Sequence, residues 1–213
     1  MIWNLPNTLT WLRIFAIPLV IVLFYLPYHW ADPAAGLLFA VAGITDSLDG
    51  YFARRMGQTS RLGAFLDPVA DKLIVAVALV LLVSKDNLPI IVSGLENFDG
   101  TATLRGASIR AILVLSAIVI IGREIAISAL REWMAEIGKS GKVKVSGLGK
   151  IKTILQIVGL SCMLFRWPLP LFGGVEFPVF EIGLVLTVVA AVLTLWSAIQ
   201  YLRAAWPDLR GHA

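Results

Sequence analysis

Long apolar runs alternate with short polar stretches along the whole chain. Each run is close to the length of a transmembrane helix, which needs about 20 predominantly apolar residues to cross a hydrocarbon layer about 30 Å thick. Between the runs, Pro, Gly and charged residues mark turns and loops. The pattern therefore predicts six membrane-spanning helices, at about 8–27, 34–53, 64–84, 109–130, 151–166 and 178–202.

The composition supports a membrane protein rather than a water-soluble domain. Hydrophobic residues make up 58% of the 213 residues and charged residues only 15%, a balance typical of polytopic membrane proteins. The length suits one helical bundle, so we expect an all-α integral membrane protein with a single domain over residues 1–213. The N-terminus has neither a basic region nor a cleavage site, so we expect no removable signal peptide.

Basic residues are distributed unevenly between the connections of the predicted helices. Six spans put both termini on one side of the membrane, together with the connections at 54–61 and 131–152. These connections and the C-terminal tail hold eleven Lys and Arg residues, whereas 85–110 and Arg166 hold four and the 28–33 turn holds none. Because cytoplasmic loops carry the excess of positive charge, we expect both termini in the cytoplasm. This topology accounts for the net charge of +4, and we expect no nucleic-acid partner.

Four aspartates interrupt the apolar pattern where the second run ends and the third begins. They are Asp46, Asp49, Asp67 and Asp71. A charged side chain at the centre of a membrane helix costs about 2.5–3.5 kcal/mol, so such residues usually serve a function. Asp46 lies eight residues before Arg54, about 12 Å along a helix. We therefore expect these carboxylates just below the cytoplasmic headgroups, within lateral reach of lipid phosphates.

Helical spacing arranges the four aspartates in two stripes. The first stripe, at i, i+3, i+4 and i+7, consists of Asp46, Asp49, Gly50 and Ala53. The second, at i, i+4 and i+8, consists of Gly63, Asp67 and Asp71. If the two helices are antiparallel neighbours, the stripes face each other. Converging carboxylates repel one another unless a cation lies among them, and oxygen-only ligands favour hard cations such as Mg²⁺, Mn²⁺ or Ca²⁺.

The same residues belong to a longer pattern with fixed gaps. The string D-x2-D-G-x2-A-R-x8-G-x3-D-x3-D is matched at every fixed position between Asp46 and Asp71. It resembles the signature of the CDP-alcohol phosphotransferases, integral membrane enzymes of phospholipid synthesis. The alternative is that the aspartates only cap or pair at helix ends, which explains neither the shared faces nor the membrane context.

The resemblance implies a reaction and a role for each motif residue. A hydroxyl attacks the lipid-side phosphorus of CDP-diacylglycerol, and CMP leaves. Two Mg²⁺ or Mn²⁺ ions are implied, with Asp71 as the general base that also contacts metal. The implied metal ligands are Asp46, Asp49, Asp67 and Asp71. The implied CDP-diacylglycerol contacts are Asp46, Asp49, Gly50, Ala53, Arg54, Gly63, Asn7 and Thr10.

Cationic residues near the predicted cytoplasmic helix ends are candidates for binding the acceptor. They are Arg13, Arg123, Arg131, Lys150 and Lys152. Arg123 lies about two turns inside its helix, where an unpaired charge is expensive. Either Glu124 and Glu132 neutralise it, or it binds an acceptor that carries its own phosphate. For Arg13 the alternatives are contact with lipid phosphate at the surface and an inward orientation toward the site.

Two further segments, 123–136 and 149–153, resemble the branch of this family that makes phosphatidylglycerophosphate, as does the N-terminal pattern from Asn7 to Arg13. That branch implies sn-glycerol 3-phosphate as the acceptor and phosphatidylglycerophosphate and CMP as products. Inositol phosphate, serine and phosphatidylglycerol remain alternative acceptors within the family. The resemblance also implies a homodimer in the bacterial inner (cytoplasmic) membrane, in contact with membrane lipids and with its site open to the cytoplasm.

Two functions outside the family also place aspartates in a helical bundle. A cation transporter needs a polar path across the membrane, but the acidic residues of this chain crowd at one face. A non-catalytic lipid scaffold needs no such motif. Release of CMP from CDP-diacylglycerol separates the enzyme from both alternatives.

Overall fold

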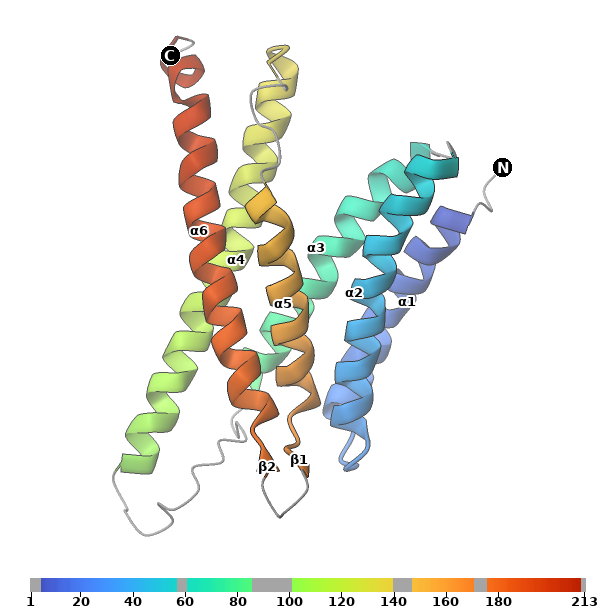
Figure 1. The fold of residues 1–213 in the computed structure, drawn as a ribbon, viewed down its shortest axis with the longest axis vertical. Coiled ribbons are helices and arrows are strands. Elements are labelled where there is room, and N and C mark those ends of the chain that lie inside the picture. The colour runs from blue at the N-terminus through green and yellow to red at the C-terminus, as the bar shows by residue number, and fades with distance from the viewer. Residues whose placement is uncertain (1–4, 57–60, 86–100, 140–146, 171–175, 212–213) are drawn as a thin grey trace.

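The computed structural model describes residues 5–56, 61–85, 101–139, 147–170 and 176–211. Within these residues the chain forms six helices and one short antiparallel strand pair (Figure 1). The helices are α1 (Leu5–Tyr25), α2 (Ala31–Met56), α3 (Arg61–Ser84), α4 (Thr101–Glu136), α5 (Gly147–Phe165) and α6 (Val179–Gly211). The strands, between α5 and α6, are β1 (Leu169–Pro170) and β2 (Glu176–Phe177).

The six helices correspond one to one to the six predicted apolar runs, which confirms the all-helical class. The helices are longer than the runs. Residues 101–108, which the run boundaries leave in a loop, are helical because α4 begins at Thr101. The connection predicted at 131–152 is shorter, since α4 continues to Glu136 and α5 begins at Gly147. The apolar pattern marks only the part of a helix that contacts lipid, whereas its backbone hydrogen bonds continue beyond that part.

The end of α4 is a hydrogen-bonded turn that depends on a glycine. Gly138 has a φ of 72°, in the left-handed region that glycine adopts without steric cost. The Lys139 amide donates to the Met134 carbonyl at 2.8 Å, and the Gly138 amide donates to the Ala135 carbonyl at 3.0 Å. These two bonds satisfy carbonyls that a helix end would otherwise leave unpaired, so α4 ends here.

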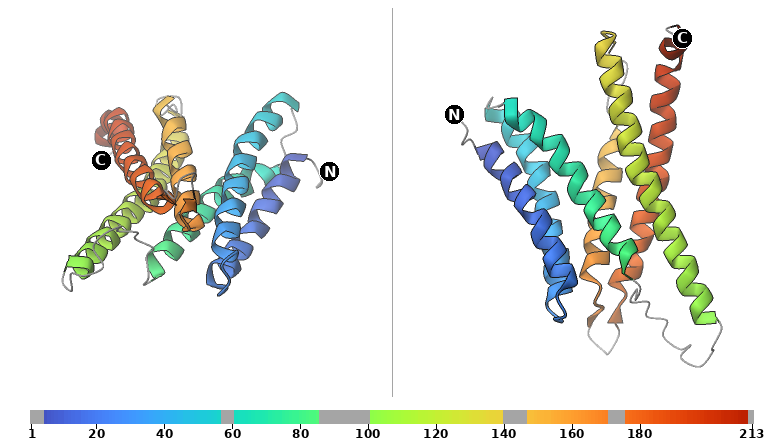
Figure 2. Two further views of the ribbon diagram at one scale, coloured as in Figure 1. Left: turned by 60° about the horizontal axis from the view of Figure 1, so that its bottom comes forward. Right: turned by 180° about the vertical axis from the view of Figure 1, so that it is seen from behind.

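The start of α1 and the end of α6 lie at the same end of the molecule (Figure 1). The end of α2, the start of α3 and the junction of α4 with α5 lie there too, as an even number of spans requires. At this end α1, α2 and α3 lean away from α4 and α6 (Figures 1 and 2). Helix α5 packs against both α2 and α6 and so joins the two groups.

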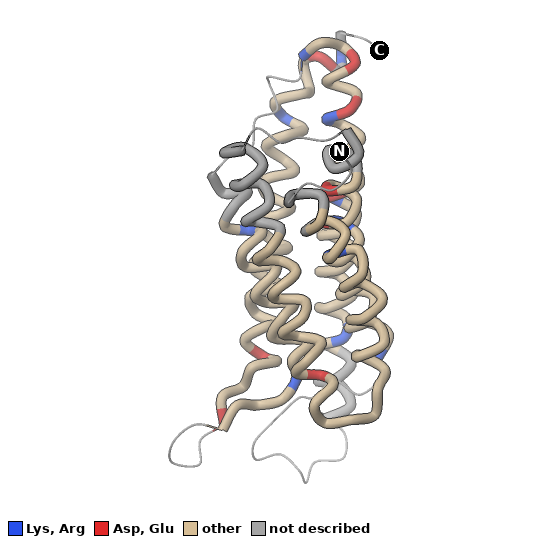
Figure 3. Tube along the Cα trace, turned by 90° about the vertical axis from the view of Figure 1, so that its right-hand side faces the viewer, with Lys and Arg blue, Asp and Glu red and all other residues tan. Residues whose placement is uncertain are grey.

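The exterior of the bundle is apolar and part of its interior is polar. Large side chains such as Phe15, Ile118 and Val192 are more than 60% exposed, whereas the cationic Arg13 and Lys152 are buried. Soluble proteins rarely expose apolar surface on this scale. Figure 3 shows charged positions gathered toward the two ends of the bundle, with a largely uncharged band between them. This distribution suits a protein surrounded by lipid.

Among the described residues, two helical segments are long and apolar enough to cross a membrane, Ser108–Glu136 and Val179–Asp208. Three shorter apolar segments accompany them, namely Thr10–Tyr25, Ala31–Thr45 and Ile151–Phe165. The described part of α3 carries Asp67, Asp71 and Lys72, which interrupt its apolar pattern; the two aspartates are half-buried and Lys72 is exposed.

Helices α5 and α6 approach closely at two glycines. A Cβ atom added to Gly159 would lie 2.7 Å from Thr187 Oγ1 and 2.9 Å from the Gly183 carbonyl oxygen. A Cβ added to Gly183 would lie 2.7 Å from the Gly159 carbonyl oxygen. Small residues permit this backbone approach, which is how membrane helices gain packing contacts without a hydrophobic driving force between them.

An ion cluster joins three helices at the end of the bundle opposite the chain termini. Asp32 Oδ1, in the first turn of α2, lies 3.5 Å from Lys85 Nζ and 3.8 Å from Arg166 Nη1. Burial lowers the pKa of the Arg166 guanidinium, and the Asp32 carboxylate opposes this decrease. The cluster connects the start of α2 with the ends of α3 and α5.

Candidate active site

The aspartate motif spans the junction of two helices. Asp46 and Asp49 lie near the C-terminal end of α2, and Asp67 and Asp71 lie in the first half of α3. Both predicted stripes are therefore on helices. Several predicted site residues fall outside the part of the structure whose side chains are described. They are Asn7, Asp46, Asp49, Gly50, Ala53, Arg54, Gly63 and Lys150, and their roles stay predictions.

Asp67 is fixed by a contact between α1 and α3. The Thr10 hydroxyl donates a hydrogen bond to Asp67 Oδ1, and Thr10 is buried. The structure thus joins Thr10, a predicted contact of CDP-diacylglycerol, to Asp67, a predicted metal ligand 57 positions away in sequence. The spacing that places Thr10 near the start of a helix gave no sign of this partner.

Arg13 points into the bundle. It lies one turn after Thr10 on α1 and is only 1% exposed, which excludes the surface orientation considered for it. It is not among the residues that line the cavity described next. The structure therefore separates Arg13 from the other described acceptor candidates.

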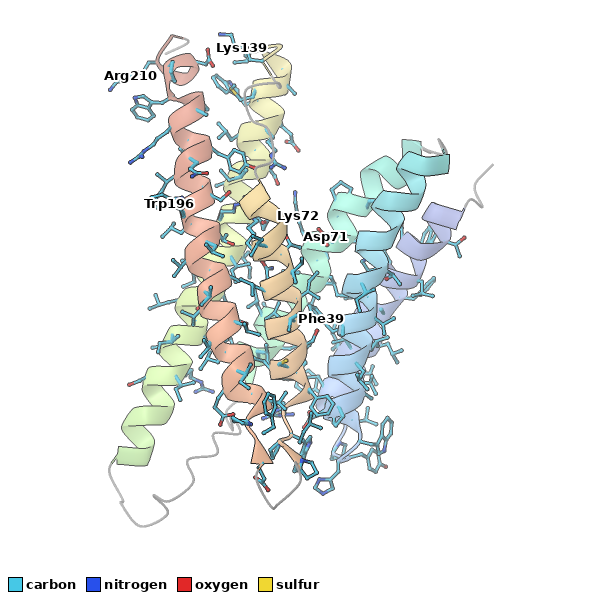
Figure 4. All side chains as sticks on the ribbon, viewed as in Figure 1. Phe39, Asp71, Lys72, Lys139, Trp196 and Arg210 are labelled. Carbon is cyan, nitrogen blue, oxygen red and sulfur yellow. The ribbon has the colours of Figure 1, made fainter. Side chains whose placement is uncertain are left out.

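A cavity of about 700 Å³ lies among α3, α4, α5 and α6. One wall is apolar, with Val69, Ile120 and Ile157 among its side chains. The charged residues lining it are Asp71, Lys72, Arg123, Glu124, Arg131, Glu132 and Lys152. Figure 4 shows Asp71 and Lys72 next to each other on α3, near the upper part of α5. The proposed base thus shares one cavity with three of the predicted acceptor cations.

Glu124 pairs with two of these cations. Arg123 Nη1 donates to Glu124 Oε1, and Lys152 Nζ lies 3.3 Å from the same oxygen. The side chains of Arg123 and Lys152 are 7% and 8% exposed. Glu124, rather than Glu132, is therefore the carboxylate that neutralises Arg123. Because the one carboxylate of Glu124 pairs with two cations, these three side chains together keep a net positive charge.

Arg123 also retains unused hydrogen-bonding capacity. Among the described residues, its buried Nε has no hydrogen-bond partner. A buried donor without a partner costs about 1–3 kcal/mol. An anion in the adjacent cavity would satisfy this donor.

Two residues of α6 contact the arginines, and the sequence did not reveal either. Ser197 Oγ lies 3.5 Å from Arg123 Nη2, and Arg131 Nη2 donates to Tyr201 Oη at 3.3 Å. A serine and a tyrosine near the end of an apolar run are usually packing or interfacial residues. The contacts depend on the packing of α4 against α6, for which the sequence pattern carries no signal.

Lys72 connects α3 to α4 at the cavity wall. Its Nζ donates to Ser128 Oγ, and Ser128 Oγ donates to the Glu124 carbonyl at 2.7 Å. The carbonyl belongs to the residue that pairs with Arg123 and Lys152. The walls of the cavity from α3, α4 and α5 are thus joined through Glu124.

The described residues supply part of a metal-binding donor set. Asp67 and Asp71 lie one turn apart on α3, and the Thr10 hydroxyl adjoins Asp67. This all-oxygen set fits a hard divalent cation. Among the described side chains, no group of three or more His, Cys, Asp or Glu residues is close enough together to hold a metal ion. Asp46 and Asp49, which complete the predicted set, are outside them.

Comparison with known proteins places these features in context. A model of the CDP-alcohol phosphatidyltransferase family matches residues 3–196. Curated proteins named CDP-diacylglycerol–glycerol-3-phosphate 3-phosphatidyltransferase from Escherichia coli (strain K12) and Shigella flexneri are 45% identical to this chain over 210 residues. The protein of that name from Salmonella typhimurium is equally similar. Each match covers 97% of this chain and 97% of the relative.

Proposed function

The chain belongs to the CDP-alcohol phosphatidyltransferase family, and we propose that it transfers the phosphatidyl group of CDP-diacylglycerol to sn-glycerol 3-phosphate. The products are phosphatidylglycerophosphate and CMP. Similarity to the named relatives over nearly the whole chain supports the substrates. The structural observation that carries the proposal is the cavity in which Asp71 lies with Arg123, Arg131 and Lys152.

The acceptor binds through its phosphate. Arg123 offers its Nε, which has no hydrogen-bond partner among the described residues, and Arg131 and Lys152 add positive charge to the same cavity. Charge-assisted hydrogen bonds to such a group contribute roughly 1.5–3 kcal/mol each. Lys150 belongs to the same proposed group, as the residue two positions before Lys152. An acceptor held in this way directs its hydroxyl toward Asp71.

Asp71 removes the proton of the attacking hydroxyl. The freed oxygen forms a bond to the lipid-side phosphorus of CDP-diacylglycerol, and the bond from that phosphorus to the bridging oxygen breaks. The electron pair leaves with CMP, so the pyrophosphate is exchanged for a phosphodiester. An alcohol is a poor nucleophile until its proton is removed, and a positioned base typically contributes about 10²–10⁴-fold.

Asp46, Asp49, Asp67 and Asp71 would hold two Mg²⁺ or Mn²⁺ ions, and such ions would neutralise the pyrophosphate and stabilise the leaving CMP. The oxygen-only donors that are described support a hard cation. The other residues proposed to contact CDP-diacylglycerol are Gly50, Ala53, Arg54, Gly63, Asn7 and Thr10.

The position of Arg13 suits a residue that binds CDP-diacylglycerol better than one that binds the acceptor. It is buried on α1, one turn from the threonine that contacts Asp67, and it does not line the cavity. We therefore assign its charge to the donor pyrophosphate. This revises the role that the sequence pattern suggested, while keeping Arg13 as a phosphate-binding residue.

The six helices cross the bacterial inner membrane, with both termini and the site on the cytoplasmic side. The shared position of the two chain ends and the charge distribution support this topology. The membrane-protein family supports the location. A homodimer is proposed from the family resemblance alone.

The test is an acceptor panel with purified protein in detergent. CMP release from CDP-diacylglycerol is measured with sn-glycerol 3-phosphate, glycerol, inositol phosphate, serine or phosphatidylglycerol, and the lipid product is identified by mass spectrometry. We expect turnover with sn-glycerol 3-phosphate only, and its loss in excess EDTA. Turnover with another acceptor would reassign the enzyme within the family. Absence of CMP release with every acceptor would favour the transporter or scaffold alternatives.

A further inference from the structure

The ring of Tyr201 lies close to two guanidinium groups. The Cζ atom of Arg123 is 5.8 Å from the ring centroid, and that of Arg131 is 5.2 Å from it. Both distances are within the range of cation–π attraction. Arg131 also donates to the Tyr201 hydroxyl at 3.3 Å. One side chain of α6 thus contacts two cations of the cavity.

The arrangement follows from helix geometry. Arg123 and Arg131 are eight residues apart on α4, which is about two turns along one face and about 12 Å of helix. Helix α6 packs against this face, and Tyr201 is 7% exposed there. Ser197, one turn earlier on α6, contacts Arg123 as well. Two residues of α6 therefore contact both arginine side chains.

A tyrosine suits this position for an electrostatic reason. Two nearby guanidiniums repel each other, while each is attracted to the negative face of an aromatic ring. Arginine side chains are also long and flexible, and holding them before the ligand arrives reduces the ordering cost of binding. Glu124 contacts Arg123 and Lys152, so it does not do this for both arginines.

We propose that Tyr201 is a positioning residue of the acceptor site, whose ring and hydroxyl hold Arg123 and Arg131 at the spacing that binds one phosphate group. The inference rests on the proposed function, because it takes the acceptor phosphate to be the ligand of these arginines. Tyr201 acts through the arginines and takes no part in the chemical step.

The experiment compares two substitutions that divide the contacts of Tyr201. Tyr201→Phe keeps the ring and removes the hydroxyl, whereas Tyr201→Leu removes both. Leu130→Ala is the matched control, because Leu130 packs in the same hydrophobic cluster as Tyr201 without lining the cavity. KM for sn-glycerol 3-phosphate, KM for CDP-diacylglycerol, kcat and thermal stability are measured for each purified protein in detergent.

We expect Tyr201→Leu to raise the acceptor KM roughly tenfold, with donor KM and kcat within about twofold of wild type. The phenylalanine variant should lie between wild type and the leucine variant, with an acceptor KM about threefold above wild type, because it keeps the ring and loses only the hydrogen bond to Arg131. Leu130→Ala should lose thermal stability without a change in acceptor KM. Together these results separate positioning of the arginines from a general role in packing.

Three outcomes would overturn the inference. The first is an unchanged acceptor KM in the leucine variant, or in Tyr201→Phe if the leucine variant does not fold. The second is an equal rise of both KM values, and the third is reproduction of the kinetic change by Leu130→Ala. In these cases wild-type turnover with sn-glycerol 3-phosphate leaves the proposed function intact. A wild-type protein that does not use sn-glycerol 3-phosphate would overturn the proposed function and the inference together.

Discussion

At the scale of single residues, the cavity holds two cationic side chains that solvent hardly reaches. Arg123 and Lys152 are both more than 90% buried and share the Glu124 carboxylate. Removing water from charged groups is costly unless they are paired and hydrogen-bonded. Within the described part of the chain, Arg123 Nε has no hydrogen-bond partner. We therefore expect an anionic ligand to complete this net positive cluster.

The first prediction concerns Arg123 as a ligand of the acceptor phosphate. Arg123→Ala should raise KM for sn-glycerol 3-phosphate by about tenfold or more, because at least one charge-assisted hydrogen bond is lost. Steady-state kinetics with the donor at saturation measures the effect. Arg203→Ala is the control, since Arg203 is an exposed arginine of α6 that does not line the cavity. A change confined to the KM of CDP-diacylglycerol would assign the cluster to the donor instead.

The second prediction concerns the chemical role of Asp71. Asp71→Asn keeps the size of the side chain but replaces the basic carboxylate with an amide. CDP-diacylglycerol should still bind, while kcat should fall at least about a hundredfold. Asp46→Asn should instead weaken metal and nucleotide binding together. Equilibrium binding of Mn²⁺ and of the donor distinguishes the two. If both variants lose Mn²⁺ to the same extent, Asp71 is mainly a ligand and the base is another group.

At the scale of elements, helix packing decides which charged residues meet. The sequence predicted the order of helices and the two aspartate stripes, because apolar run lengths and spacings of three and four residues are local properties. It named both Glu124 and Glu132 as candidate partners of Arg123, whereas the structure pairs Arg123 with Glu124. It also gave no sign of Tyr201, which lies 70 positions from Arg131. Both depend on how α4, α5 and α6 pack, and a single sequence does not encode that in any local pattern.

The third prediction tests the close contact of α5 with α6. Gly159→Val should destabilise the protein strongly, because even a Cβ at this position would lie 2.7–3.0 Å from atoms of Thr187 and Gly183. Overpacking of a tight interior typically costs about 1–3 kcal/mol, and here the opposing atoms include backbone, which cannot rotate away. Thermal unfolding in detergent measures the loss. Gly122→Val on α4 is the control, since a Cβ there would meet nothing within 4 Å. Equal losses in the two variants would contradict the packing argument.

At the scale of the whole molecule, two helices extend beyond the others at the end that holds the chain termini. Helices α4 and α6 contain 36 and 33 residues, or about 50 Å each at 1.5 Å per residue, against a hydrocarbon layer of about 30 Å. Lys139 Nζ lies 2.7 Å from Asp208 Oδ1 near their tips, and Figure 4 shows Lys139 and Arg210 there. The two helices thus form a support that is longer than a hydrocarbon layer is thick and that carries Arg131 and Tyr201.

The last prediction tests the orientation of this support. If both termini are cytoplasmic, the exposed residue Glu136 at the end of α4 faces the cytoplasm, and the exposed residue His29 between α1 and α2 faces the other side. Single cysteines are introduced as Glu136→Cys and His29→Cys, with the native Cys162 replaced by alanine. A membrane-impermeant maleimide should label position 29 in intact spheroplasts and position 136 only after permeabilisation. The reverse labelling pattern would invert the topology and place the Asp71 cavity, and with it the proposed acceptor site, on the side away from the cytoplasm.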